Sequence, residues 1–269
     1  MISTLQFATE LARSTGKLLT EFYRPGGSEA RLKADQSVVT EADLAADRLV
    51  KQAIRDAYPQ DLLLSEELHP SLSVGHQEAV WVVDPLDGTT NFSLGLHIWG
   101  VSIARAVNGI PETGAIYFPL LDELYSAQIG TGAFWNGERI RVHPMDKEKP
   151  ATFFACCGQT HKLYNVSVPY KPRILGSAAY DFCALARGAA VLTFEATTKI
   201  WDMAAAWVLI LEAGGVIESH HGPSPFPLTP GMDYTTRAFP TLAAATAKMV
   251  VKGRNMIEIK NELLLRNDG

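Results

Sequence analysis

An apolar stretch that runs directly into an acidic turn constrains this chain most. Residues 79–84 read Ala-Val-Trp-Val-Val-Asp, which predicts a buried strand that ends in a carboxylate. Pro85 favours an extended conformation at Asp84 and begins a turn, and Gly88 permits backbone angles that other residues rarely adopt. Thr89 is well suited to open a following helix. The sequence therefore predicts a strand, a turn and a helix start in close succession.

The same turn carries candidate ligands for a metal and an anion. Asp84 and Asp87 could share one cation or bridge two, and the carbonyl of Leu86 lies between them. The backbone N–H groups of Gly88 and Thr89 at a helix start would attract an anion. Hard oxygen ligands beside an anion site suit Mg²⁺ with a bound phosphate. Asp-Pro and Asp-Gly are also common in plain turns, so these residues alone leave a structural turn as an equal alternative.

Three further acidic elements extend this pattern. Glu66 and Glu67 end a short apolar stretch, and Asp202 opens a predicted helix. Thr40 and Asp43 have the spacing of a capping box. Taken singly, each element is explained by a solvated acidic turn or a helix cap. Four acidic elements together are much harder to explain in that way, which favours a metal site.

The remaining pattern predicts alternating helices and strands. Helices are expected at 5–22, 41–57, 177–187 and 201–213. Strands are expected at 62–64, 79–84, 97–106, 113–117, 123–128, 152–157, 190–194 and 216–219, with a hairpin turn at Asn136-Gly137. Residues 222–240 contain five prolines and are interpreted as a surface loop. No linker divides the 269 residues, so one catalytic unit is expected, with an N-terminal α+β part at about 1–146 and a C-terminal α/β part at about 147–269.

Composition excludes several classes of protein. The net charge of −5 argues against a protein whose main work is to bind nucleic acid, although a local basic patch stays open. Three cysteines make no disulfide framework. There is no apolar run long enough to span a membrane, and Glu10, Arg13 and Lys17 interrupt any signal-peptide core. We therefore expect a soluble, cytoplasmic protein.

Taken together, the motifs resemble the inositol monophosphatase family of Mg²⁺-dependent, lithium-sensitive phosphatases. Residues 84–92 match the family signature Asp-Pro-(Ile/Leu)-Asp-Gly-Thr-x-Asn-Phe, and residues 201–205 match its second signature, Trp-Asp-x-Ala-Ala. Weaker matches at 39–43, 66–67 and 176–179 come in the family's order. The resemblance covers nearly the full chain. It implies a layered α/β fold, the αβαβα sandwich of the inositol monophosphatase and fructose-1,6-bisphosphatase superfamily, usually found as a homodimer.

The resemblance also assigns metal ligands, for two or three Mg²⁺ ions. The first ion would be held by Glu66, Asp84 and the carbonyl of Leu86. The second would be held by Asp84, Asp87 and Asp202. A third, weaker ion would lie near Glu66 through waters.

Catalytic and substrate roles follow from the same resemblance. Thr89, linked to Asp43, would orient and help deprotonate the attacking water, with Glu66 taking part through its metal. The backbone of Gly88 and Thr89 would bind phosphate. Substrate hydroxyls would be contacted by Asp87, Ala178 and Glu195.

The resulting hypothesis is a phosphomonoesterase that hydrolyses inositol 1-phosphate or a similar polyol or sugar phosphate by attack of a metal-activated water. Residues 90–92, Thr-Asn-Phe, favour the inositol branch of the superfamily. Fructose-1,6-bisphosphatase activity stays open because Lys199 could face the site, unless it points to water. Nucleotide 3′-phosphatase and histidinol-phosphatase activities are further alternatives. A non-catalytic regulatory binding protein is the alternative from another class, but every expected metal ligand is present.

Overall fold

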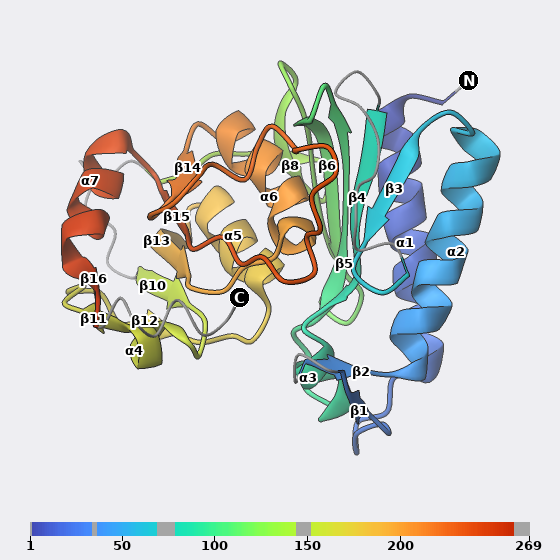
Figure 1. Ribbon diagram of the computed structural model, residues 1–269, viewed down its shortest axis with the longest axis horizontal. Helices are drawn as coiled ribbons and strands as arrows, with labels where there is room; N and C mark the ends of the chain where they lie inside the picture. Colours follow the sequence, from blue (N-terminus) through green and yellow to red (C-terminus); the bar gives the residue numbers. More distant parts are fainter. Residues whose placement is uncertain (1, 34–36, 69–78, 144–151, 261–269) are drawn as a thin grey trace.

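The computed structural model describes residues 2–33, 37–68, 79–143 and 152–260 as five stacked layers (Figure 1). The first layer consists of helices α1 (Thr4–Phe22) and α2 (Glu41–Ala57). The second is a seven-stranded sheet in the order β3-β4-β5-β6-β7-β8-β9. Helices α5 (Ala178–Ala186) and α6 (Ile200–Glu212) form the middle layer. A five-stranded sheet in the order β12-β10-β13-β15-β14 follows, and α7 (Ala247–Met256) covers its outer face. The expected αβαβα sandwich is confirmed.

The strands and the short elements complete the architecture. The large sheet contains β3 (Leu62–Ser65), β4 (Ala79–Asp87), β5 (Gly100–Val107), β6 (Ile110–Phe118), β7 (Glu123–Gln128), β8 (Gly132–Trp135) and β9 (Glu138–Ile140). The second sheet contains β10 (Phe153–Cys156), β12 (Pro172–Arg173), β13 (Ala190–Glu195), β14 (Val216–Ser219) and β15 (Thr241–Ala244). The short elements are β1 (Arg31–Leu32), β2 (Val38–Val39), α3 (Thr89–Ser93), α4 (Thr160–Leu163), β11 (Tyr164–Val166) and β16 (Ile257–Ile259). The hairpin at Asn136-Gly137 is confirmed, with both residues at positive φ.

Strand β4 is buried on both faces, and this determines where its carboxylates point. Trp81 and Val83 pack under α1 and α2, whereas Val80 and Val82 belong to the core that surrounds α5 and α6. Side chains alternate along a strand, so Asp84 follows Val80 and Val82 onto the α6 side of the sheet.

A bulge at the end of β4 brings a second carboxylate to the same face. Asp84 lies opposite Ser102 of β5, and Asp87 lies opposite Gly100, so three steps along β4 match two along β5. Residues Ser102 and Gly100 are two apart and therefore share a face. The extra residue consequently turns Asp87 to the same side as Asp84. The sequence predicted the end of the strand at Asp84, and this bulge explains why the pairing continues to Asp87.

Close packing places the start of α6 beside these carboxylates. A Cβ atom on Gly114 of β6 would lie 2.7 Å from the carbonyl oxygen of Ala205, so only glycine allows α6 to approach the sheet at this point. The hydroxyl of Ser102 donates to the carbonyl of Trp201 at 3.3 Å. These contacts fix the first turn of α6, which carries Asp202, over the end of β4.

The proline-rich segment 222–240 runs over the surface as expected, but some of its side chains reach into the core. Four of its apolar side chains are buried in the core around α5 and α6, namely Phe226, Leu228, Tyr234 and Phe239. The Leu228 N–H donates to the carbonyl of Gly109 at 2.8 Å, which joins the segment to the β5–β6 turn. Proline prevents regular pairing but does not prevent burial of the residues between. The segment is therefore an irregular surface segment that these four side chains anchor to the core.

Two other expectations have different outcomes. Among the described residues, no helix combines the length and the apolar character that crossing a bilayer requires. The division into parts at about 1–146 and 147–269 stays a prediction, since the central core draws residues such as Val82 and Ala243 from both halves.

Candidate active site

The ends of two strands and the starts of three helices enclose a cavity of about 340 Å³. Strands β4 and β13 end there, and the first residues of α3, α5 and α6 line it. All the residues predicted for the site line this cavity except Asp43. Asp43 lies outside the lining and accepts a hydrogen bond from Thr89. The N-terminal ends of helices carry free N–H groups and partial positive charge. The cavity therefore combines these helix N-terminal ends with the carboxylates described below.

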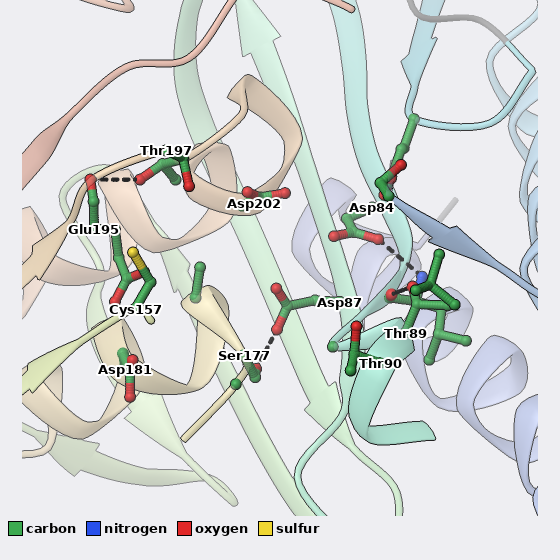
Figure 2. Close-up of a pocket in the computed structure, with 18 of the residues that line it drawn as sticks. Asp84, Asp87, Thr89, Thr90, Cys157, Ser177, Asp181, Glu195, Thr197 and Asp202 are labelled. Carbon is green, nitrogen blue, oxygen red and sulfur yellow. Dashed lines mark hydrogen bonds between the residues drawn. The ribbon is translucent and has the colours of Figure 1, made fainter. Parts of the chain in front are cut away.

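Three aspartates meet on one side of the cavity (Figure 2). One carboxylate oxygen from each of Asp84, Asp87 and Asp202 can be chosen so that all lie within 4.8 Å of one another. The Leu86 N–H donates to Asp84 Oδ1 at 2.9 Å, and the Lys199 N–H donates to Asp202 Oδ2 at 2.9 Å. Asp87 accepts hydrogen bonds from the Ser177 hydroxyl and from the backbone of α5. Local hydrogen bonds thus hold each carboxylate in place.

Burial and mutual repulsion dominate the electrostatics of this aspartate cluster, and the positive charge of Lys199 only partly offsets them at Asp202. Burial raises the pKa of Asp84 well above its ordinary value, and repulsion from Glu66, Asp87 and Asp202 adds to this effect. Burial likewise raises the pKa of Asp87, to about 6. The pKa of Asp202 is raised by burial and then by repulsion from Asp87 and Glu66. A divalent cation would relieve this repulsion, and an all-oxygen donor set is the one Mg²⁺ prefers. The residues present therefore fit the metal that the resemblance implies.

Glu66 lies in the same cavity but has a partner that the sequence analysis missed. Lys33 Nζ lies 2.8 Å from Glu66 Oε1 and 2.5 Å from Glu67 Oε1. Burial lowers the pKa of Lys33, but attraction to Glu66 and hydrogen bonds to both glutamates outweigh it and raise the pKa overall. Lys33 is far from Glu66 in sequence, and no local pattern links the two. In this structure Glu66 forms an ion pair, and its expected role as a metal ligand stays a prediction.

Thr89 and Asp43 are in direct contact. Thr89 Oγ1 lies 3.0 Å from Asp43 Oδ1 and 3.0 Å from the carbonyl oxygen of Leu86. The other carboxylate oxygen, Asp43 Oδ2, accepts from the Thr40 backbone N–H at 2.7 Å and from the Thr40 hydroxyl at 2.5 Å. Asp43 thus closes the capping box of α2 with one oxygen and contacts Thr89 with the other. Burial raises the pKa of Asp43 to about 6.

The opposite side of the cavity holds a buried pair of carboxyl groups. Figure 2 shows Glu195, Asp181 and Cys157 gathered there, across from Asp84 and Asp87. A hydrogen bond joins Asp181 to Glu195, and burial raises the pKa of Asp181 to about 8 and the pKa of Glu195 well above its ordinary value. Asp181 Oδ1 and Glu195 Oε1 have no hydrogen-bond partner among the described residues. Both buried oxygens thus lack a hydrogen bond within the described part of the chain.

Sequence analysis predicted Glu195 but not Asp181. The available signal was its position, one helical turn after Ser177 in the first turn of α5. An acidic residue there is most simply explained as a favourable charge at a helix start, so the sequence alone does not mark it as a site residue.

Lys199 neither faces the cavity nor points to water. Its Nζ donates to the carbonyl of Thr235 at 2.6 Å and so holds the 222–240 segment against α6. Its backbone N–H holds Asp202. The two orientations that the sequence left open are both replaced by a structural role.

Comparison with known proteins agrees with this geometry. The model of the inositol monophosphatase family matches residues 2–252. Nus factor SuhB of Escherichia coli (strain K12) is 35% identical over 238 residues, which cover 84% of this chain and 88% of the relative. A fructose-1,6-bisphosphatase/inositol-1-monophosphatase of Thermotoga maritima is 33% identical, over 81% of this chain and 85% of the relative. The solved structure of a Thermotoga maritima IMPase superposes with a TM-score of 0.77 at 26% identity and full coverage of both chains. The chain belongs to the inositol monophosphatase family.

Proposed function

We propose that the protein is a Mg²⁺-dependent phosphomonoesterase that hydrolyses inositol 1-phosphate or a similar polyol or sugar phosphate. The observation that carries this proposal is the cluster of Asp84, Asp87 and Asp202 beside the Thr89–Asp43 contact. A cation bound by this cluster and the Thr89 hydroxyl would lie next to the N–H groups at the start of α3, and hydrolysis of a phosphate ester needs these features together.

Asp84, Asp87 and Asp202 would hold the metal, with Glu66 joining them if Lys33 moves away. When bound, Mg²⁺ supplies neutralisation of the phosphoryl oxygens and a lowered pKa for the attacking water. The backbone N–H groups of Gly88 and Thr89 would orient the phosphate.

Thr89 and Asp43 would then manage the proton. Because Thr89 Oγ1 donates to Asp43 Oδ1, its lone pairs remain free to accept a hydrogen bond from a water. The proton of that water can pass to Thr89 while the hydroxyl proton moves to Asp43. The pKa of Asp43, about 6, keeps this carboxylate ionised and basic at neutral pH.

Glu195 and the backbone around Ala178 would bind the alcohol part of the substrate. Glu195 Oε1 is a buried oxygen with no partner among the described residues, so a ring hydroxyl would satisfy it. The Thermotoga maritima relative, which is named for both a sugar bisphosphate and inositol 1-phosphate, supports a polyol or sugar substrate. We also propose that the protein is cytoplasmic, forms a homodimer and has no nucleic-acid or membrane partner. Analytical ultracentrifugation would test the oligomeric state.

The decisive experiment compares Asp84→Asn with the exposed control Asp56→Asn on α2. We expect wild type and Asp56→Asn to release phosphate from inositol 1-phosphate in Mg²⁺ and to lose this activity in EDTA. Asp84→Asn should be folded, by circular dichroism, but inactive. Near wild-type turnover by folded Asp84→Asn would overturn the proposal. A panel with fructose 1-phosphate, histidinol phosphate and a nucleoside 3′-phosphate would then rank the substrates by kcat/KM.

A second candidate function is regulatory binding, which the name of the Escherichia coli relative, a Nus factor, supports. The substrate panel distinguishes the two functions. If the protein acts only as a binding partner, no member of the substrate panel will be hydrolysed and Mg²⁺ will not matter.

A further inference from the structure

A second cavity of about 350 Å³ adjoins the active site. Thr197 lines both cavities, and its neighbour Ala196 lines the second one directly after Glu195 lines the first. Phe239, Pro223 and Leu163 give this second cavity apolar walls. A ligand held by Glu195 could therefore continue past Thr197 into the second space, which we name the Arg237 cavity after its charged residue.

Two hydrogen bonds fix the segment that carries Arg237 to the active-site loop between β13 and α6. Lys199 Nζ donates to the carbonyl of Thr235 at 2.6 Å, and the Phe239 N–H donates to the carbonyl of Thr198 at 2.8 Å. Arg237 lies midway between these two attachments. The same loop thus determines the position of Glu195 on one side and of the Arg237 segment on the other.

Arg237 is a cation without a partner. It is exposed, and it forms no ion pair or hydrogen bond with any residue in the described ranges. His221 also lines this cavity. Its ring nitrogen Nδ1 is buried and has no hydrogen-bond partner among the described residues. A guanidinium group in a cavity with an unsatisfied ring nitrogen and threonine hydroxyls has the chemistry of an anion site.

We propose that the Arg237 cavity is a subsite for the second anionic group of a two-ended substrate, such as a sugar bisphosphate. This inference rests on the proposed function, because it places the reacting phosphate at the aspartate cluster and the remote phosphate at Arg237. A preference for bisphosphates would then come from Arg237 and not from Lys199. The sequence suggested Lys199 as the second cation, but the ammonium of Lys199 donates to the Thr235 carbonyl, whereas Arg237 has no ion pair or hydrogen bond within the described part of the chain.

The test uses two substrates that differ only in the remote phosphate, fructose 1,6-bisphosphate and fructose 1-phosphate. Arg237→Gln is compared with Arg48→Gln, an exposed arginine on α2. In wild type and Arg48→Gln, we expect kcat/KM to be about tenfold higher for the bisphosphate. In Arg237→Gln this preference should disappear through a higher KM for the bisphosphate, with kcat and the fructose 1-phosphate kinetics unchanged. A tenfold change corresponds to about 1.4 kcal/mol.

Calorimetric binding of fructose 1,6-bisphosphate, measured at fixed salt, separates this inference from the proposed function. If no substrate is hydrolysed but Arg237→Gln still weakens binding about tenfold, the subsite stands and the proposed function fails. If phosphate esters are hydrolysed and Arg237→Gln leaves both the preference and the binding unchanged, the subsite is refuted and the proposed function stands. An equal loss for both fructose phosphates would also refute the subsite, because the effect would then not depend on the remote phosphate.

Discussion

Replacement of Asp181 by asparagine should stabilise the protein, increasingly so as the pH rises. Burial raises the pKa of Asp181 from 3.8 to about 8, so folding at neutral pH forces this carboxyl group to take up a proton. For an acid whose pKa is raised on folding, the stability is fully present below its unfolded pKa and is lost as the pH rises toward the folded value. At pH 7 the free-energy cost of protonating Asp181 on folding is about 4 kcal/mol, from about 1.4 kcal/mol per pKa unit. An asparagine has no such term, and its amide can donate to Glu195.

The assay is urea unfolding of wild type, Asp181→Asn and the exposed control Asp56→Asn at pH 5, 6, 7 and 8 in constant Mg²⁺. The free energy of unfolding of Asp181→Asn minus that of wild type should grow by about 1.4 kcal/mol per pH unit between pH 5 and 7, and by less as the pH approaches the folded pKa of about 8. Asp56→Asn should show a difference that does not depend on pH. The reasoning is refuted if the Asp181→Asn difference is flat, or if wild type becomes the more stable protein at pH 8. Either result would mean that Asp181 is ionised in the folded protein.

Two other perturbations probe the metal site and the proton path. Mg²⁺ at 100 times its Kd should stabilise the wild type by about 2.7 kcal/mol and raise the Tm by several degrees relative to EDTA. Asp202→Ser retains a helix-capping side chain but loses a ligand, so a Mg²⁺-induced Tm shift as large as that of wild type would assign Asp202 a capping role only. Thr89→Ala and Asp43→Asn should each lower kcat by about 10²–10⁴-fold with little change in KM. The double variant should be little worse than either single one, and multiplicative losses would show that Asp43 acts mainly as a cap for α2.

Elements with clear ends were predicted closely from the sequence. Helix α2 begins and ends at the predicted residues because Thr40 caps it and Pro59 follows it. Strand β15 was not predicted, although it lies between β13 and β14 in the second sheet. Its sequence, Thr-Leu-Ala-Ala, has little intrinsic preference for a strand. Its neighbours in the sheet stabilise it, and such long-range pairing leaves no trace in a local pattern.

The residues of the candidate site likewise fall into those that a local motif predicts and those that depend on distant partners. Asp84, Asp87 and Thr89 lie within one short motif, so the residue types and spacing were enough to predict them together. The residues that were missed act through partners far away in sequence, as Lys33 does with Glu66 and Asp181 with Glu195. Such pairs depend on which layers the fold brings together, and composition or periodicity does not encode that information.

The fold also suggests how the proposed cation and phosphate would be bound side by side. Each carboxylate of the aspartate cluster accepts a hydrogen bond, Asp84 from the Leu86 N–H and Asp202 from the Lys199 N–H. In Asp84 and Asp202 each of these bonds uses one carboxylate oxygen, whereas Asp87 accepts from Ser177 and from the backbone of α5. Carboxylates in the first turn of a helix are stabilised by the N–H groups there, which is why Asp202 at the start of α6 can remain close to Asp84. At the start of α3 no carboxylate uses the helix end, because its N-cap is Gly88 at φ 86°. We propose that this helix end takes the phosphate of the substrate.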